Sequence, residues 1–325
     1  MLSILHHRSK EPRCRAWRKA ILGGCLSVGL FSQGAFASVV ASIRPLAFIT
    51  AAITEGVMPV EVLLPPLASP HHYHLRPSDL RRLHQAELVI WVGPELESFL
   101  SQPLRMALAP QLMLSGVPTI RRLLKNSYQT LTTPPDTSLI TKQAEQASCC
   151  AQHTHYDPHI WLSPEIARQI ARQLQSQLIQ LRPKQRQRIN ANVKRLEQQL
   201  QQCEQEIRQQ LAPLSKQNYW VFHQAYAYFE THFGLRQRGH FKVNPAIAPG
   251  AKRLQEIQKQ LQQLGQVCLF TEPQFQPAVI LRMMSGTSAK LGCLDPLGTQ
   301  IAIGRDSYPH FLKQLSQQFA DCLTE

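Results

Sequence analysis

One apolar seam between Pro183 and Leu211 limits the folds open to this chain more than any other feature. Its apolar residues recur at steps of three or four, which places them on one face of an α-helix, and the residues between them are polar or charged. They are Ile189, Val193, Leu196, Leu200, Cys203, Ile207 and Leu211. A helix over this stretch spans about 43 Å, longer than a typical globular helix. The pattern alone fits a coiled-coil segment, a long core helix or a connector between two halves.

The flanking regions favour the connector. On both sides, short β-like runs alternate with helical patterns, as in parallel sheets covered by helices. Strands are predicted at 38–43, 60–64, 88–92, 117–120, 219–222 and 267–271, and helices at 46–55, 77–86, 95–108, 163–178, 225–233, 252–264, 279–285 and 308–323. We therefore expect an α/β fold with two parallel-sheet lobes, residues 38–182 and 213–325, joined by a rigid connector helix over 183–212. Residues 126–156 lack any periodicity and are predicted to form a mobile loop.

The N-terminus has the features of a cleaved signal peptide. A region with six basic residues precedes a mostly apolar run from Ala20 to Phe36. Ala35-Phe36-Ala37 is an A-x-A cleavage site, so export and a mature chain that begins at Ser38 are predicted. The alternative is lipid attachment at Cys25, but the apolar core that leads into its Leu22-Gly-Gly-Cys25 sequence is only Ala20–Leu22.

The charge pattern argues against a nucleic-acid partner. Removing residues 1–37 takes away six of the 35 basic residues and one of the 21 acidic residues, which leaves 29 against 20, or +9. The remaining basic residues are scattered along Arg/Gln-rich helices. No basic run is interleaved with aromatic residues, as nucleic-acid binding would favour.

The histidines are unevenly distributed. His71, His72 and His74 crowd a loop between a predicted strand and a predicted helix, His159 precedes a helix, and His223 follows a strand. Ligands of open parallel sheets bind beyond the carboxyl ends of the strands. Three neutral imidazoles and one carboxylate, for which Asp295 is a candidate, suit a tetrahedral zinc site. The spacing of these residues in the sequence does not by itself specify a zinc site, because each histidine taken singly is typical of an exposed loop.

Five motifs in one order carry a family resemblance. They are Ala68–Asp79, Asp157–Trp161, Val221–Phe229, Phe270–Pro277 and Leu294–Gly298. With them, essentially the whole mature chain resembles the periplasmic zinc-binding protein of high-affinity zinc ABC transporters. The resemblance implies a monomeric binding protein rather than an enzyme. Such a protein has two α/β lobes joined by one long helix, captures Zn²⁺ in the cleft between the lobes, and delivers it to a membrane permease.

Position by position, the resemblance implies four zinc ligands and one supporting residue. The ligands are His71 and His159 from the first lobe, and His223 and Asp295 from the second. Glu272, at a strand end, is expected to orient a histidine. Two positions depart from the family: Pro70 stands where a glutamate often precedes the first ligand, and the loop before Asp157 offers only His153 and His155. The sequence leaves the roles of these two histidines, and of His72 and His74, open.

The resemblance also implies a disulfide between Cys268 and Cys322. Six cysteines remain after removal of Cys14 and Cys25, and export exposes them to oxidising conditions. Such a bridge would fasten the C-terminal helix and contribute on the order of 3–4 kcal/mol.

Three other functions compete with zinc delivery. The first is a zinc hydrolase with Glu272 as general base, which would need an open coordination position and a substrate pocket. The second is a manganese carrier of the same transporter class, although related carriers place a carboxylate where this chain has His223. The third is a surface adhesin anchored through Cys25.

Overall fold

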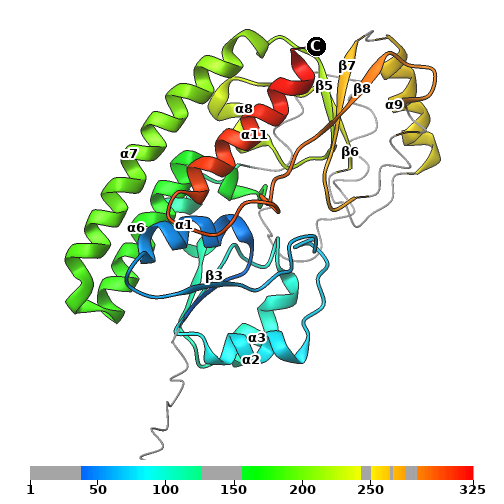
Figure 1. Cartoon of the computed structure of the whole chain (residues 1–325). Coiled ribbons are helices and arrows are strands. Elements are labelled where there is room, and N and C mark those ends of the chain that lie inside the picture. The colour runs from blue at the N-terminus through cyan, green and yellow to red at the C-terminus, as the bar shows by residue number, and fades with distance from the viewer. Residues whose placement is uncertain are drawn as a thin grey trace, which may run out of the picture. The chain divides into compact units, whose positions relative to one another are not determined.

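The computed structural model describes residues 38–125, 156–242, 250–263, 266–275, 281 and 284–324. Two four-stranded sheets, each wholly parallel, form the framework (Figure 1). The first has the spatial order β2-β1-β3-β4 and the second repeats it as β6-β5-β7-β8. The strands are β1 (Val39–Ala41), β2 (Val60–Val62), β3 (Leu88–Trp91), β4 (Gln111–Met113), β5 (Tyr219–His223), β6 (Gly239–Lys242), β7 (Val267–Thr271) and β8 (Ala289–Cys293). We call the part of the chain around the first sheet the N-lobe and the part around the second the C-lobe.

Helices connect and cover the strands. Those of the N-lobe are α1 (Arg44–Thr54), α2 (Pro77–Gln85), α3 (Ser101–Met106), α4 (Pro118–Arg121) and α6 (Pro164–Leu181), and those of the C-lobe are α8 (Ala227–Phe233), α9 (Ala251–Gln263) and α11 (Ser307–Leu323). As predicted, Ser163 caps α6 by accepting a hydrogen bond from the Ile166 N–H, and Pro164 occupies the first turn. No helix among the described residues is long and apolar enough to cross a membrane.

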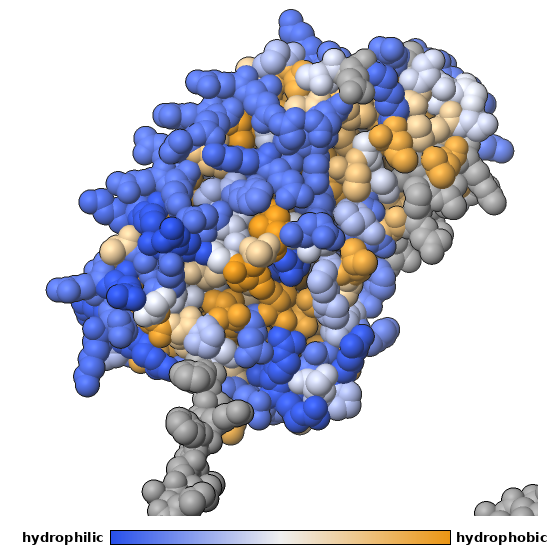
Figure 2. Space-filling model, in the orientation of Figure 1, coloured by the Kyte–Doolittle hydropathy of each residue, from blue (hydrophilic) through white to orange (hydrophobic). Residues whose placement is uncertain are grey.

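The long helix α7 (Arg186–Leu211) lies between the two lobes in sequence and packs against both. A 3₁₀ turn at Pro183–Gln185 precedes it and another at Ala212–Leu214 follows. All seven residues of the predicted seam are buried. They face α6 and α1 of the N-lobe and α8 and α11 of the C-lobe, while the opposite side of α7 is hydrophilic (Figures 1 and 2). The predicted architecture of two parallel-sheet lobes with a long helix between them is therefore confirmed.

Hydrogen bonds fasten the long helix to its neighbours. Buried Asn192 donates its amide to the carbonyl oxygens of Ile53 and Glu55, at the end of α1, over 2.8 and 3.0 Å. Further along, the Cys203 thiol donates to the Pro309 carbonyl oxygen in α11 at 3.5 Å. These bonds tie the helix to α1 of the N-lobe and to α11 of the C-lobe.

Direct contacts also join the lobes beside the helix. Trp161 of the N-lobe donates its indole N–H to the Pro296 carbonyl oxygen at 2.7 Å, and Tyr308 of α11 donates to the Trp161 carbonyl oxygen at 2.8 Å. The rings of Phe48 and Phe311 pack with centroids 5.9 Å apart. These groups are buried, so separating the lobes would expose unpaired polar atoms and apolar surface.

We therefore expect the lobes to move little when metal binds. A helix with no internal glycine or proline is a poor hinge, and the Trp161 and Tyr308 bonds oppose a wide opening. Solution scattering of the metal-free and zinc-bound protein should give nearly the same radius of gyration. A large decrease on zinc addition, as in jaw-like closure, would contradict this expectation.

The N-lobe corrects two sequence predictions. The strand predicted at 117–120 is wrong, because Pro118 begins the short helix α4. The fourth strand is β4 instead, which has only three residues and one buried side chain, Leu112, too short a pattern to recognise. The helix predicted at 95–108 is shorter, with a 3₁₀ turn at Ser98–Leu100 leading into α3.

Two strands of the C-lobe, β6 and β8, were not predicted, and glycine explains why. A Cβ at Gly239 would lie 2.6 Å from the Trp220 ring, and one at Gly292 would lie 2.5 Å from the Phe270 ring. Aromatic side chains on the neighbouring strands therefore occupy the space that a side chain would need. Glycine weakens the strand pattern in the sequence while permitting this packing. The helix predicted at 279–285 falls largely outside the described residues.

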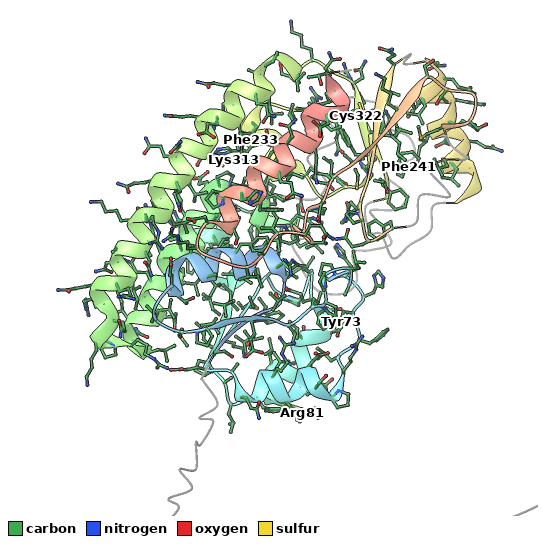
Figure 3. The ribbon with its side chains drawn as sticks, in the orientation of Figure 1. Tyr73, Arg81, Phe233, Phe241, Lys313 and Cys322 are labelled. Carbon is green, nitrogen blue, oxygen red and sulfur yellow. A yellow bond between two sulfur atoms is a disulfide. The ribbon has the colours of Figure 1, made fainter. Side chains whose placement is uncertain are left out.

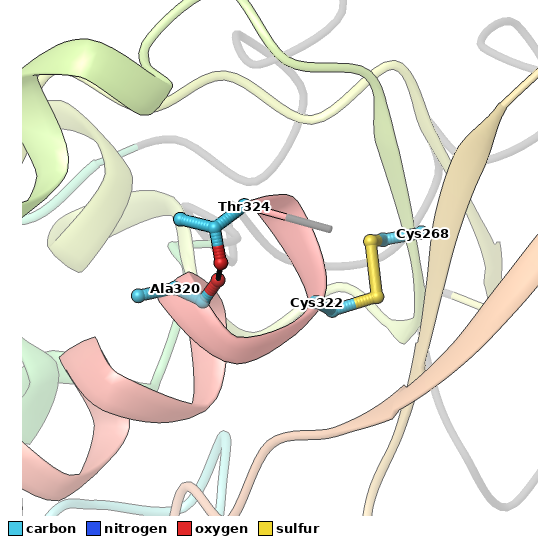
Figure 4. The surroundings of a disulfide bond; sticks show 4 residues. All are labelled: Cys268, Ala320, Cys322 and Thr324. Atoms are coloured by element: carbon cyan, nitrogen blue, oxygen red, sulfur yellow. Dashed lines mark hydrogen bonds between the residues drawn. A yellow bond between two sulfur atoms is a disulfide. The ribbon is translucent and has the colours of Figure 1, made fainter.

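The disulfide between Cys268 and Cys322 is present (Figure 4). It joins β7 to the last turn of α11, with the two Cα atoms 6.1 Å apart. Of the other cysteines in the described part of the chain, Cys203 is buried and Cys293 is exposed, and both are free. The bridge fastens the C-terminal helix to the second sheet, as the resemblance implied.

Candidate metal centre

Three histidines from separate segments meet at the boundary between the lobes. His71 lies in the loop between β2 and α2, His159 precedes the 3₁₀ turn Ile160–Leu162, and His223 is the last residue of β5. One ring nitrogen of each lies within 4.8 Å of the others. The ring centroids are 4.7 Å apart for His159 and His223, 5.0 Å for His71 and His223, and 5.4 Å for His71 and His159.

The nitrogens that face one another have no protein partner. The Nε2 atoms of all three histidines are buried and make no hydrogen bond within the described structure. A buried polar atom without a partner costs free energy unless something else occupies the site. Three histidines with ring nitrogens within 4.8 Å of one another and with unpartnered Nε2 atoms have the donor set of a transition-metal site.

A carboxylate fixes the His159 ring from behind. Asp157 Oδ1 lies 2.7 Å from His159 Nδ1 and also accepts the His159 backbone N–H at 3.0 Å. Asp157 is itself buried, and its carbonyl oxygen accepts the Tyr228 hydroxyl of the C-lobe at 2.9 Å. A proton on Nδ1 shared with the carboxylate leaves the Nε2 lone pair directed at the centre.

The second carboxylate, Glu272, stands behind His223 in the same way. Its Oε1 lies 3.2 Å from His223 Nδ1 and accepts the Tyr226 hydroxyl at 3.2 Å. Burial, reinforced by the Glu272 charge, raises the pKa of Tyr226 well above its usual value, so the hydroxyl remains a donor. The predicted neighbour of a site histidine therefore contacts His223.

Burial also favours the metal-binding, neutral form of two of the histidines, His71 and His223. It lowers the pKa of His71 well below the usual value, and the neighbouring His223 and His159 add to the effect. Burial lowers the pKa of His223 as well, although Glu272 partly opposes that shift. Neutral imidazole has the free lone pair that a metal ion requires.

Asp295, expected as the fourth ligand, does not join the three histidines in this structure. Its carboxylate accepts the Leu297 N–H at 3.1 Å, and the Thr299 N–H and hydroxyl at 2.6 and 2.7 Å. These bonds hold the loop whose Pro296 and Leu297 line the pocket beside the histidines. The structure thus brings together three of the four predicted ligands and gives Asp295 a different set of partners.

We predict that Asp295→Asn mainly lowers the free energy of unfolding and has a smaller effect on zinc affinity. An amide cannot accept all three bonds, so the free energy of unfolding should fall by about 1–3 kcal/mol. Zinc affinity should fall much less than it does on loss of a histidine. Denaturant unfolding and zinc titration of the same variant separate the two effects. Equal losses of zinc affinity in Asp295→Asn and His223→Ala would instead make Asp295 a direct ligand.

The remaining histidines of interest do not line the centre. His72 and His74 are exposed on the loop that carries His71, and His153 and His155 lie outside the described residues. Asp157 was not predicted to be a site residue. Its position two residues before His159 was the available signal, because aspartate side chains often bond the backbone N–H two residues on.

The pocket at the centre is small. It holds about 20 Å³ and is lined by residues from both lobes, including His71, His159, His223, Glu272 and Phe275. That volume accommodates one or two water-sized guests. A single metal ion fits such a space.

Comparison with known proteins identifies the family. Residues 39–322 match the family model described as zinc-uptake complex component A, periplasmic (ZnuA). The chain belongs to the ZnuA family. Among its relatives, the high-affinity zinc uptake system protein ZnuA of Yersinia pestis is 48% identical over 320 residues, covering 94% of this chain and 97% of that protein. The protein of the same description from Haemophilus ducreyi is 39% identical over 291 residues, covering 89% and 94%.

Solved structures share the fold. A crystal structure of ZnuA superposes with a TM-score of 0.69 at 24% identity, over 88% of this chain and 99% of that one. Members of the ZnuA family are transport binding proteins and not enzymes, as the resemblance implied.

We predict that Asp157→Ala weakens zinc binding although Asp157 is not placed to touch the metal. Without the carboxylate, the His159 ring loses its fixed orientation and its Nδ1 partner, so zinc affinity should fall about 10–100-fold. The zinc affinity of Asp157→Asn, which retains an oxygen acceptor, should fall less. Chelator-competition titration measures both variants. An unchanged affinity in Asp157→Ala would show that the contact does not orient the ligand.

Proposed function

We propose that this protein captures Zn²⁺ in the periplasm and delivers it to the membrane permease of a high-affinity zinc ABC transporter. The observation that supports this most strongly is the convergence of three buried, unpartnered Nε2 atoms in a pocket of ionic size. In this proposal His71, His159 and His223 are the protein ligands, water completes the coordination, and Asp157 and Glu272 orient two of the rings. The relatives' names agree with this cargo.

The ligand set favours zinc over manganese. Imidazole nitrogens suit Zn²⁺, whereas Mn²⁺ prefers carboxylate oxygens, and the general affinity order also ranks Zn²⁺ above Mn²⁺. Both nearby carboxylates, Asp157 and Glu272, are engaged with histidine Nδ1 atoms. A manganese carrier is therefore the second candidate. A zinc hydrolase is disfavoured because members of the ZnuA family are transport binding proteins.

The proposal includes the following organisation of the chain. Residues 1–37 are a signal peptide cleaved after Ala37, residues 38–182 and 213–325 form the two lobes, and residues 183–212 connect them. The mature protein acts as a monomer and has no nucleic-acid partner. Mass spectrometry of the mature N-terminus tests the cleavage position, and it would also reveal lipid at Cys25.

Metal analysis of the protein purified from the periplasm without added metal tests the function. We expect about one zinc per chain, with little manganese. A chain loaded mainly with manganese, or a metal-free chain that zinc does not fill, would contradict the proposal.

A further inference from the structure

One polar side chain beside the three histidines has no protein partner. Gln274 lines the metal pocket, and its Oε1 and Nε2 are both buried without a hydrogen bond within the described structure. The other polar groups of the pocket wall are engaged: the Trp161 indole and the Glu272 carboxylate have partners, and Ser69 Oγ accepts a backbone N–H. Among the lining residues that the structure describes, Gln274 is therefore the one besides the histidines whose buried polar side-chain atoms remain unpaired.

A turn after β7 holds Gln274 at the pocket. The Phe275 N–H donates to the Glu272 carbonyl oxygen at 3.1 Å, so the chain turns at Gln274. Both ends of this turn contact His223, because Glu272 Oε1 lies 3.2 Å from its Nδ1 and the Phe275 ring meets its ring edge-on with centroids 6.3 Å apart. Phe275 also packs against the apolar cluster of the C-lobe that includes Phe241, which is labelled in Figure 3. These contacts fix the backbone that carries Gln274.

The pocket has room for a zinc ion and one small ligand. Its volume is about 20 Å³, and a water molecule needs roughly 10–15 Å³. Three imidazoles leave one position of a tetrahedral zinc ion for water. An enclosed water requires hydrogen-bond partners in the surrounding wall. The Gln274 amide offers an acceptor and two donors and carries no charge, so it can meet that requirement.

We propose that Gln274 positions the water that completes the zinc coordination, by accepting a hydrogen bond from it. The inference rests on the proposed function, because this water has its place only when the centre holds zinc. Asp157 and Glu272 already stand behind two of the histidines, and a third carboxylate at this position would suit the harder Mn²⁺. A water held by a neutral amide leaves the ion bound by three neutral ligands, which suits a cargo that must later be released.

Two substitutions at Gln274 separate hydrogen bonding from packing. Gln274→Leu removes the amide and keeps a side chain of similar size, whereas Gln274→Glu keeps the length and an oxygen but adds a charge. Gln266→Leu is the matched control, because Gln266 is an exposed glutamine of the same lobe just before β7. Chelator-competition titration gives the zinc affinity, and stopped-flow mixing with excess chelator gives the rate of zinc release. The absorption spectrum of bound Co²⁺ reports the coordination geometry, and denaturant unfolding gives the stability of the metal-free protein.

We expect Gln274→Leu to bind zinc about ten-fold more weakly, to release it faster and to change the Co²⁺ spectrum. Its metal-free form should be at least as stable as the wild type, because the substitution removes a buried amide that has no partner. Gln274→Glu should bind zinc at least as tightly as the wild type and release it more slowly, because a carboxylate can bind the ion in place of water. Gln266→Leu should match the wild type in every measurement.

Wild-type zinc affinity and an unchanged Co²⁺ spectrum in Gln274→Leu would overturn the role of Gln274 and leave the proposed function intact. Equal losses of affinity in Gln274→Leu and Gln274→Glu would overturn it as well, because only the packing of the original side chain would then matter. A weaker affinity that accompanies lower metal-free stability would assign Gln274 a structural role instead. Absence of tight zinc binding by the wild type would overturn the proposed function itself.

Discussion

Replacing His223 with alanine is expected to remove tight zinc binding. His223 supplies one of three converging nitrogens, and it is buried at the carboxyl end of β5 where no other described imidazole can replace it. Loss of a metal ligand should reduce zinc affinity more than loss of a carboxylate that only orients a ligand. We therefore expect zinc affinity to fall by more than about 100-fold. His71→Ala and His159→Ala should behave alike, because each removes an equivalent nitrogen.

A chelator-competition titration measures this effect, and His310→Ala is the matched control. His310 is an exposed histidine on α11, in the same lobe as His223. The control should bind zinc as the wild type does, and circular dichroism should show that His223→Ala remains folded. Wild-type zinc affinity in His223→Ala would remove this residue from the ligand set.

Loss of the disulfide should cause the largest change in stability. The bridge closes a loop with a sequence separation of 54 residues. By the chain-entropy relation, replacing both Cys268 and Cys322 with serine should lower the free energy of unfolding by about 4 kcal/mol. The bridge lies at the start of β7, whereas Glu272 and the histidine site lie beyond the other end of that strand. Zinc affinity of the folded variant should therefore change little.

Denaturant unfolding under non-reducing conditions measures the loss, and Cys293→Ser is the control. Cys293 is exposed and free, so its replacement should leave stability nearly unchanged. Adding reductant to the wild type should reproduce the loss seen in the double variant. Equal stability of the double variant and the wild type would show that the bridge does not constrain the unfolded chain.

The sequence predicts the parts of the structure that rest on a long apolar pattern or on an uneven distribution of one residue type. The seven-residue seam of α7 extends over the whole helix, so its burial could be predicted from spacing alone. The strands β1, β3, β5 and β7 are continuous apolar runs, as buried parallel strands are. By contrast β4, β6 and β8 are short or carry glycine, and their formation depends on neighbouring strands that the local sequence does not reveal.

The site was predictable as a set of residues but not as a geometry. His71, His159 and His223 could be selected because motif positions and strand ends pointed to them. Asp295 followed the same logic, yet the structure engages its carboxylate with Leu297 and Thr299 in its own loop. Hydrogen bonds within this loop fix the direction of the Asp295 carboxylate. The spacing of residues in the sequence does not reveal those bonds. Asp157 was not selected, although its place two residues before His159 permits the contact with that ring that the structure shows.

Competitive titration with zinc and manganese, on the wild type and His223→Glu, tests the central claim most directly. The wild type should bind zinc far more tightly than manganese, because three imidazoles provide the site. His223→Glu should shift the relative preference toward manganese by replacing a nitrogen with a carboxylate. A wild type that prefers manganese, or a His223→Glu variant with unchanged preference, would contradict the assignment of a three-histidine zinc site.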